Sequence, residues 1–499
     1  MQMSSTTTDR DVTIDRKSWM MSAAETKSTL ESRLDALQSH FTWDLVFGKS
    51  ILVRLRDTLK DIGTDERNFW LGHVYNLQGF VHYHMGLVEE AQSFLSKATE
   101  AFHQIRKGDS DEGPWLLVNY GNLAWLHHYL GEEEESERYL SKVDGLMKEY
   151  PSPSEDELHP EVYAEKAWTL LNFGKDAKKQ AADYFQRAIR MQPDMVEWQT
   201  SYVLGLVNAF NYKTNLSTDV LEKLRAATEK DPENMYLAIH CLEQKAKEGE
   251  DMEEIKDEAR ELAEKISVNP VSSYSGMKAI LRLYKKYISY DDAINLAEEA
   301  LRKHPDDRYL KRCAALCYKW KIIFDKDILP TQSMMDRAIS LHRDVISLYP
   351  DSALVKKIDL ANIYGKSSQT MHKAEQIYQE LLEEDMELMD KQVLYYRYAR
   401  YLVFDRDERN MSIDYLMKAA EIPQSSFFRE NSIKELEKIL RRRKNRRCND
   451  IQEFLENLQD YNPELLEEQM ELMDKQMLYN CYARYLYYDH REYNKSVIT

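Results

Sequence analysis

The chain has 499 residues, a formal net charge of −18, and only 15 glycines and 12 prolines. This length exceeds what one compact core can bury, so several domains or a repeat array are required, and the scarcity of Gly and Pro excludes a β-rich or loop-rich fold. The negative charge excludes broad binding to nucleic acid or anionic membranes, so any nucleic-acid site must be local and enclosed.

Residues 1–30 are rich in Ser, Thr and Asp, and no apolar period starts before Leu30, Leu34 and Leu37. This pattern predicts a mobile N-terminal tail. The segment lacks the apolar stretch of a secretion signal, and the chain has no run of about 18 apolar residues that could cross a bilayer. We therefore expect a cytoplasmic protein without membrane insertion.

From residue 31 the chain repeats one pattern of small, aromatic and aliphatic residues at a spacing of about 34 residues, which is the tetratricopeptide signature. The copy within 72–102 reads Tyr75, Gly79, His82, Gly86, Ala91, Leu95 and Ala98. Later copies close with Ala181, Phe185, Ala188 and Pro193; with Leu224, Ala227 and Pro232; with Ala293, Ala297, Ala300 and Pro305; and with Ala374, Tyr378 and Leu381.

The small residues of this pattern let two antiparallel helices approach closely, and Pro ends the second helix. One hairpin cannot bury its own apolar face, whereas stacked hairpins bury it and wind into a superhelix. The sequence therefore predicts an all-α tetratricopeptide superhelix, an α-solenoid, with a concave inner groove or tunnel as the binding face.

Longer connections rich in Pro, Ser and Asp at 150–160 and 326–332 indicate boundaries between groups of repeats. The predicted organisation is a tail at 1–30, N-terminal repeats at 31–150, central repeats at 161–325, C-terminal repeats with a basic helix at 333–447, and a duplicated, possibly incomplete repeat at 448–499.

The duplication pairs 380–413 with 464–497, in which 23 of 34 positions are identical at an offset of 84. Such identity far exceeds that of divergent structural repeats. Either a selected extra repeat or an artefact of the gene model explains it.

Catalytic and metal-binding patterns are absent from the sequence. There is no GxxxxGK[ST], GxGxxG or GxSxG motif, and no set of His and Cys supplies the four ligands of a structural zinc site. The five cysteines, Cys241, Cys313, Cys317, Cys448 and Cys481, include no CxxC pair, which is typical of reduced thiols. We expect neither an enzyme nor a bound cofactor.

Five short segments carry a resemblance to one family: HFTWDL at 40–45, YGNLAW at 120–125, AEKAWTLLNFG at 164–174, DPENMY at 231–236 and LCYK at 316–319. With these segments the chain resembles the interferon-induced proteins with tetratricopeptide repeats. The likeness runs in order from about residue 30 to residue 447, after which the duplication displaces the family pattern.

The resemblance implies an antiviral effector of innate immunity whose superhelix encloses a basic tunnel. Members of that family close the tunnel on the 5′ end of single-stranded RNA, bearing a triphosphate or an incompletely methylated cap, and thereby block translation of foreign RNA. Such recognition needs no hydrolysis, because Arg and Lys neutralise phosphates while aromatic rings stack on bases. The resemblance also implies self-association or pairing with related repeat proteins, and it allows translation or signalling proteins as further partners.

Carried over residue by residue, the family's tunnel tryptophan falls on Trp168, and its RNA-contacting asparagine and tyrosine fall on Asn234 and Tyr236. A family arginine falls on Lys278, which keeps the charge but loses the bidentate fork, and a family histidine falls on Arg312. The resemblance thus implies a basic pocket at its later end.

The earlier end departs from the family pattern. An expected lysine is Asn172, an expected arginine is Asn208 and an expected glutamine is Ile62. The two lost cations remove charge-assisted contacts worth about 1.5–3 kcal/mol each. Lys175 and Lys178, the latter at a position where the family has tyrosine, are candidates to restore the positive charge.

The run KILRRRKNRR at 438–447 is the strongest basic cluster of the chain and includes Arg442 and Arg443. Such clusters indicate nucleic-acid contact or nuclear import, and a partner-docking surface is the alternative. In the family a basic helix at this place lines the distal tunnel, which favours RNA.

Two hypotheses result. In the first, the chain binds RNA 5′ ends through Trp168, Lys175, Lys178, Asn234, Tyr236, Lys278, Arg312, Arg442 and Arg443. In the second, it is a protein-interaction scaffold of the antiviral response with a degenerate RNA pocket. For Trp168 itself, core packing is the alternative to lining the tunnel.

Overall fold

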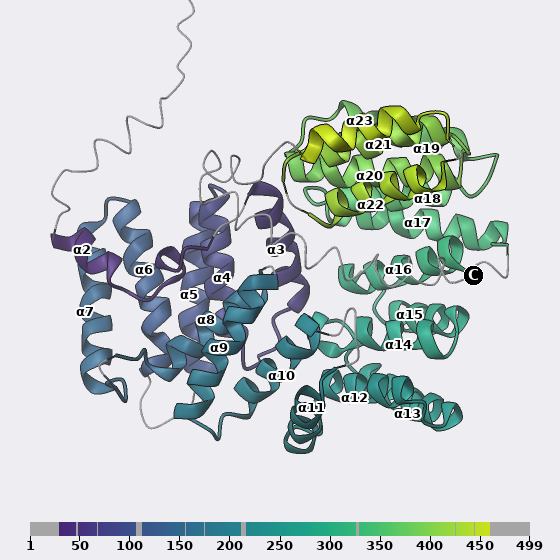
Figure 1. The fold of residues 1–499 in the computed structure, drawn as a ribbon. Helices are drawn as coiled ribbons and strands as arrows, with labels where there is room; N and C mark the ends of the chain where they lie inside the picture. Colours follow the sequence, from purple (N-terminus) through teal and green to yellow (C-terminus); the bar gives the residue numbers. More distant parts are fainter. Residues whose placement is uncertain are drawn as a thin grey trace, which may run out of the picture.

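The computed structural model describes residues 29–45, 48–66, 68–105, 112–154, 156–173, 175–210, 216–325, 329–424, 426–443 and 445–459. Within these residues the chain forms 22 α-helices and three 3-10 helices, and no strand occurs among them (Figure 1). The predicted all-α fold is confirmed. Among the helices described, none is both long and apolar enough to cross a membrane.

The helices before residue 195 are α2 (Thr29–Asp35), η1 (His40–Thr42), α3 (Lys49–Ile62), α4 (Leu71–His84), α5 (Val88–Ile105), η2 (Pro114–Leu116), α6 (Leu117–Tyr129), α7 (Glu133–Glu149), α8 (Pro160–Leu171) and α9 (Lys175–Met191). The following helices, up to residue 324, are α10 (Val196–Phe210), α11 (Thr218–Lys230), α12 (Met235–Glu248), α13 (Met252–Ile266), η3 (Ser273–Ser275), α14 (Met277–Tyr287), α15 (Tyr290–Lys303) and α16 (Arg308–Phe324). The last are α17 (Gln332–Leu348), α18 (Leu354–Tyr364), α19 (Met371–Glu383), α20 (Leu388–Phe404), α21 (Arg409–Glu421), α22 (Phe427–Arg442) and α23 (Cys448–Gln459).

From α4 onward, consecutive helices pack against each other as hairpins, as the repeat pattern predicts. The small residues explain the close approach. A Cβ atom added at Gly79 of α4 would lie 2.6 Å from the side chain of Leu95 on α5. Ala91 and Ala98 of α5 are also fully buried. Larger side chains at these positions would force the two helices apart.

The buried apolar residues form a succession of cores along the chain rather than one centre. Each core joins neighbouring hairpins, as expected for a solenoid whose repeats contact mainly their neighbours. In Figure 1 the chain runs from the purple and blue helices on the left, through α10 and α11 at the bottom, to the green and yellow helices on the right.

Helix α3 departs from this local pattern because it contacts both halves of the array. Its apolar residues Leu52, Leu55, Leu59 and Ile62 pack into the core that contains α4 and α8. Its charged side chains pair instead with residues after 300: Arg54 with Asp390 at 3.2 Å and Arg56 with Asp351 at 2.7 Å. Figure 1 shows α3 between the N-terminal helices and α16 to α22. Helix α3 therefore joins the two arms of the superhelix.

The first copy of the duplicated segment forms the end of α19, all of α20 and the start of α21. The second copy at 464–497 and residues 1–28 lie outside the described residues. The division of the chain into groups of repeats stays a prediction. Cys241, Cys313, Cys317 and Cys448 are free thiols, and Cys481 lies outside the described residues.

Candidate nucleic-acid interface

Trp168 lies on α8, a helix that starts with Pro160 and is capped by His159, whose Nδ1 accepts the N–H of Glu161 at 3.2 Å. The indole is only 4% exposed and stacks on Trp70 of α4, with ring centroids 5.8 Å apart and an interplanar angle of 14°. Trp168 therefore belongs to the packing between two hairpins, whatever else it contacts.

A buried polar network lies one helical turn before Trp168. Asn76 donates a hydrogen bond to Glu165 at 2.8 Å, and Asn119 donates one to Asn76 at 2.7 Å. Burial raises the pKa of Glu165 to about 8, and the carboxyl lies 3.9 Å from His73 Nε2. These contacts join α4, α6 and α8 and fix the position of the Trp70–Trp168 stack.

Tyr274 extends this aromatic group toward solvent. It lies on η3, and the residue is 41% exposed, whereas Trp70 and Trp168 are buried. Burial of its hydroxyl raises the pKa of Tyr274, and a hydrogen bond with the Trp168 side chain opposes that rise. The repeat pattern did not single out Tyr274, because it lies in a connection between hairpins. The only local signal is the turn sequence around it, which ends at Gly276 with a positive φ of 85°.

Asn234 and Tyr236 stand at the start of α12. Asn234 is the N-cap: its Oδ1 accepts the N–H of Leu237 at 3.3 Å, and its Nδ2 donates to Asp231 at 3.0 Å. The Tyr236 hydroxyl donates to the carbonyl of Ser273 at 2.6 Å, and burial raises its pKa to about 12. Both residues thus have structural roles, and Tyr236 ties α12 to the turn that carries Tyr274.

Two cations, Arg282 of α14 and Arg312 of α16, influence the pKa of Tyr236. Arg282 and Arg312 both favour its ionised form, although burial outweighs them. Arg312 and Lys278 likewise oppose the rise in the pKa of Cys313, which burial takes to about 11. The structure therefore brings Tyr236, Lys278 and Arg312 together, with Arg282 added to the predicted set.

We call Trp168, Tyr236, Tyr274, Lys278, Arg282 and Arg312 the inner cluster. The four predicted members come from four different hairpins. Tyr274 connects Trp168 with Tyr236. An accessible aromatic residue in one cluster with several cations can bind a nucleotide by stacking and charge.

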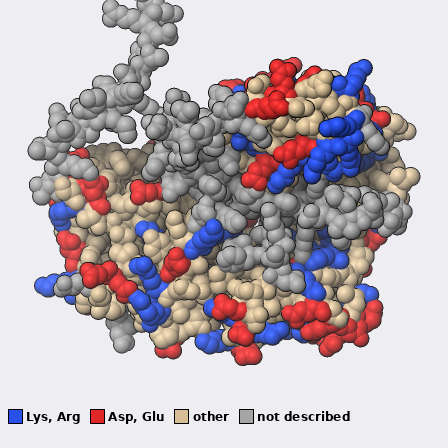
Figure 2. Space-filling view, viewed as in Figure 1, with Lys and Arg blue, Asp and Glu red and all other residues tan. Residues whose placement is uncertain are grey.

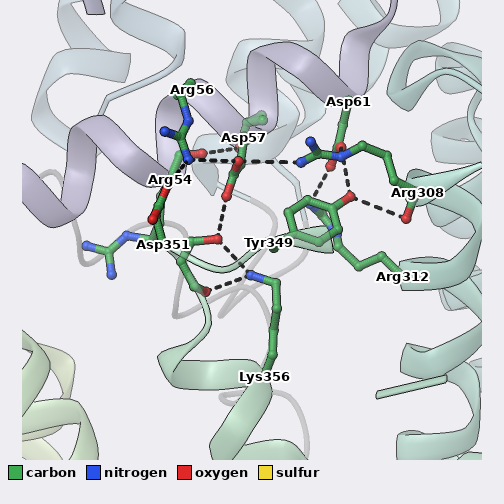
Figure 3. A network of polar contacts seen from close by, with 11 residues as sticks. Arg54, Arg56, Asp57, Asp61, Arg308, Arg312, Tyr349, Asp351 and Lys356 are labelled. Atoms are coloured by element: carbon green, nitrogen blue, oxygen red, sulfur yellow. Dashed lines mark hydrogen bonds and ion pairs between the residues drawn. The ribbon is translucent and has the colours of Figure 1, made fainter. Parts of the chain in front are cut away.

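Arg312 belongs to the inner cluster, but its charge is already paired with a carboxylate of α3 (Figure 3). Its guanidinium donates to Asp61 Oδ2 at 2.5 Å, and Arg308 forms an ion pair with Asp61 Oδ1 at 3.0 Å. The Tyr349 hydroxyl also donates to Asp61, at 2.8 Å. The Asp61 side chain is 1% exposed, so this carboxylate is buried among three donors.

The network continues along α3 to α18. Asp57 accepts a hydrogen bond from Ser352 at 2.5 Å and lies 3.5 Å from Arg308. Lys356 donates to the carbonyl and hydroxyl of Ser352 at 2.7 and 2.9 Å, and its Nζ lies 4.8 Å from the centre of the Tyr349 ring. Burial and the nearby Arg312 lower the pKa of Lys356 to about 8.

Two residues that differ from the family pattern at the earlier end of the pocket, Asn172 and Ile62, have structural roles. Asn172 ends α8 and donates to the carbonyl of Trp168 at 3.0 Å. Ile62 is buried, and its carbonyl accepts the hydroxyl of Ser272. Lys178 is half-buried on α9, and Asn208 is half-buried on α10. The side chain of Lys175 lies outside the described residues.

The basic run forms the end of α22 and the turn after it. Arg442 and Arg443 are exposed, and Arg443 adopts a left-handed conformation with φ 48°. The positive charges of Lys438, Arg400 and Arg442 all lower the pKa of the half-buried Glu435, which burial raises. Helices α20 and α22 therefore share a basic face. Figure 2 shows Lys and Arg gathered over this part of the molecule. These arginines lie several hairpins beyond the inner cluster and do not join it.

No candidate metal site accompanies these residues in the described part of the chain. There, no group of three His, Cys, Asp or Glu side chains is placed to hold a metal ion. The polar groups of the inner cluster are aromatic hydroxyls and cations, which suit binding rather than nucleophilic chemistry.

Comparison with known proteins agrees with the resemblance found in the sequence. No family model matches the chain. The human antiviral innate immune response effector IFIT1 is 26% identical over 443 residues, covering 85% of this chain and 90% of that protein. Human interferon-induced protein with tetratricopeptide repeats 2 is 24% identical over 460 residues, covering 88% and 93%.

Among solved structures, the human IFIT1 dimer with PPP-AAAA matches with a TM-score of 0.60 at 24% identity, covering 89% of this chain and all of that one. The human IFIT1 dimer with m7Gppp-AAAA matches with a TM-score of 0.61 at 24% identity and the same coverage. These structures confirm the predicted superhelical fold. The chain is thus a homologue of the interferon-induced proteins with tetratricopeptide repeats, as its sequence predicts.

Proposed function

We propose that this homologue of the interferon-induced proteins with tetratricopeptide repeats binds the 5′ end of single-stranded RNA at its inner cluster and catalyses no reaction. The observation that carries the proposal is the half-exposed Tyr274, which contacts the buried Trp168 and lies near Tyr236, the residue whose pKa Arg282 and Arg312 lower. An aromatic ring supplies stacking that tolerates any base, and Lys and Arg supply contacts to phosphate. Two of the matching IFIT1 structures hold short RNAs with 5′-triphosphate or capped ends.

The distal basic face gives the RNA a second point of contact. Arg442 and Arg443, with Lys438 and Arg400, lie farther along the array than the inner cluster. Because the whole chain is acidic, these local cations attract a single strand to defined places rather than to the whole surface. The 5′ end lies at the inner cluster, and the following nucleotides run toward α22.

The biological role follows from enclosing the end of the RNA. A 5′ end held inside the protein is withheld from the translation machinery, so the protein acts as a cytoplasmic antiviral effector. Self-association and pairing with related repeat proteins belong to the same proposal, since the matching IFIT1 structures are dimers.

The second candidate function is a protein-interaction scaffold of the antiviral response, with translation or signalling proteins as partners. Two observations favour it. The side chains of Asn172 and Asn234 form hydrogen bonds with the backbone at helix ends, and Arg312 is paired with Asp61. In that case the inner face binds a peptide and not RNA.

Equilibrium binding of the full chain to one short single-stranded RNA distinguishes the two functions. The RNA carries a 5′-triphosphate, an unmethylated cap, a 5′-monophosphate or a 5′-hydroxyl, at one fixed salt concentration. Affinities that differ among the four ends support the proposal. Equal, weak binding to all four contradicts end recognition and leaves the scaffold.

A further inference from the structure

The contact between Asp61 and Arg312 has a consequence for which RNA ends the inner cluster accepts. Arg312 belongs to that cluster and pairs with α3, and its charge is already matched by a carboxylate 2.5 Å away. The Asp61 carboxylate is also held by Arg308 and Tyr349 and is 1% exposed. Releasing Arg312 to another anion would leave a buried carboxylate with fewer partners, which is costly.

The charges around this point nearly cancel. The cations Arg56, Arg308, Arg312 and Lys356 face the carboxylates of Asp57, Asp61 and Asp351. The fourth cation, Lys356, is partly desolvated, and its hydrogen bonds go to the neutral oxygens of Ser352. A highly charged ligand group that reaches Arg312 therefore competes with the Asp61 carboxylate, which already neutralises this cation.

The positions that carry cations in the family pattern at the earlier end of the pocket add no positive charge here. Asn172 is uncharged and is occupied by the end of α8, and Asn208 is uncharged as well. The aromatic part of the cluster, by contrast, stays accessible through Tyr274. Stacking through Tyr274 is thus retained at this site, while one of its three cations, Arg312, is matched by a carboxylate.

We propose that Asp61 is a specificity-determining residue that makes the inner cluster discriminate against a free 5′-triphosphate. The preferred ligand is a 5′ end with a stacking base and less terminal charge, such as a capped end. A cation that is already paired with a buried carboxylate contributes less to binding an anionic ligand. This inference rests on the proposed function, because it concerns which RNA end the same site accepts.

The experiment compares the affinities of triphosphate, capped and 5′-hydroxyl forms of one RNA for the unaltered chain and for Asp61→Asn. Asparagine keeps the shape and an acceptor oxygen but removes the charge. For the unaltered chain we expect capped RNA to bind tightest and the triphosphate to bind no better than the hydroxyl. Asp61→Asn should raise the ratio of triphosphate to hydroxyl affinity about tenfold.

Asp57→Asn is the matched control, since it removes the same charge from the same helix without touching Arg312. It should change the ratio by less than Asp61→Asn does. An equal change in both variants overturns the inference, because bulk charge would then explain the effect.

Wild-type binding decides the question even if Asp61→Asn fails to fold, as judged by circular dichroism. An unaltered chain that binds triphosphate RNA more than tenfold tighter than hydroxyl RNA overturns the inference while supporting end recognition. Absence of binding to any of these RNAs contradicts both the proposed function and the inference.

Discussion

Glu387, just before α20, accepts a hydrogen bond from the backbone N–H of Lys49, the first residue of α3, at 2.9 Å across 338 residues of chain. Its second oxygen accepts the N–H of Ser50 at 3.3 Å. The first N–H groups of a helix have no partner within the helix, so this carboxylate caps α3 from the other arm. The two arms of the superhelix are therefore joined at the start of α3 as well as at Asp61.

Replacing Glu387 should weaken this junction. We expect Glu387→Ala to lower the free energy of unfolding by about 0.5–2 kcal/mol, the usual cost of a lost N-cap. Thermal unfolding followed by circular dichroism measures this loss as a lower midpoint temperature of unfolding. Glu384→Ala is the control, because its partner Lys357 is a surface residue and such pairs contribute about 0–1 kcal/mol. Equal effects of the two substitutions would show that the cap does not hold α3.

Tyr274 should matter for RNA and little for stability. Because its ring is the exposed part of the aromatic group, Tyr274→Ala should weaken RNA binding by about 1–3 kcal/mol. Tyr274→Phe keeps the ring and serves as the control, with most of the affinity retained. Fluorescence anisotropy with a labelled single strand gives both values. An unchanged affinity in Tyr274→Ala would remove this residue from the site.

Trp168 should behave in the opposite way. Its buried stacking on Trp70 leads us to expect that Trp168→Ala destabilises the fold by about 3–5 kcal/mol. Thermal unfolding is the measurement, and Trp168→Phe should lose less. A Trp168→Ala protein that unfolds like the original but binds no RNA would show that the indole serves the ligand and not the core.

Stability should depend on the ionisation of Glu165. Its pKa is about 8 in the folded chain against an ordinary 4.5, so the folded chain binds more protons than the unfolded chain between these values. The free energy of unfolding therefore falls as the pH rises from 4.5 to 8, and the loss is complete above 8. Glu165→Gln stays neutral and should be more stable than the original chain at pH 9.

At pH 5 the same substitution should have little effect, because Glu165 is then protonated in the folded chain. Thermal unfolding at the two pH values provides the comparison. Glu157→Gln, which alters a carboxylate paired with the exposed Arg190, should show no such pH dependence. A stability difference for Glu165→Gln that is the same at pH 5 and pH 9 would contradict a buried, neutral Glu165.

Arg442 should contribute to affinity through charge alone. Arg442→Gln should weaken binding to all RNA ends alike and reduce the slope of log affinity against log salt by about 0.7. Lys303→Gln removes one positive charge from α15, where Lys303 pairs with Glu299 at 3.1 Å, and should leave the slope unchanged. Identical slopes in the two variants would place RNA away from α22.

The hairpins could be predicted from the sequence because their cause is local. Small residues such as Gly79 and Ala91 recur at fixed spacing wherever two helices touch. The inner cluster was predictable in part, since Trp168, Tyr236 and Lys278 occupy positions that the family resemblance marks. Tyr274 escaped prediction because connections between hairpins carry no period.

The partner of Arg312 could not be foreseen for a different reason. Asp61 lies 251 residues earlier, and the two meet only because the superhelix curves until α3 reaches α16. The curvature sums small rotations over many repeats, and no local pattern encodes that sum. A cation read from the sequence as available to a ligand is thus found matched by a carboxylate.

The most direct measurement is crosslinking of a capped single-stranded RNA that carries a photoreactive nucleotide at its first position, followed by mass spectrometry of the crosslinked peptides. We expect crosslinks to η3 and the starts of α12 and α14, the segments that hold Tyr274, Tyr236 and Lys278. Crosslinks found only at α22, or spread over the outer helices, would contradict an inner cluster that holds the 5′ end.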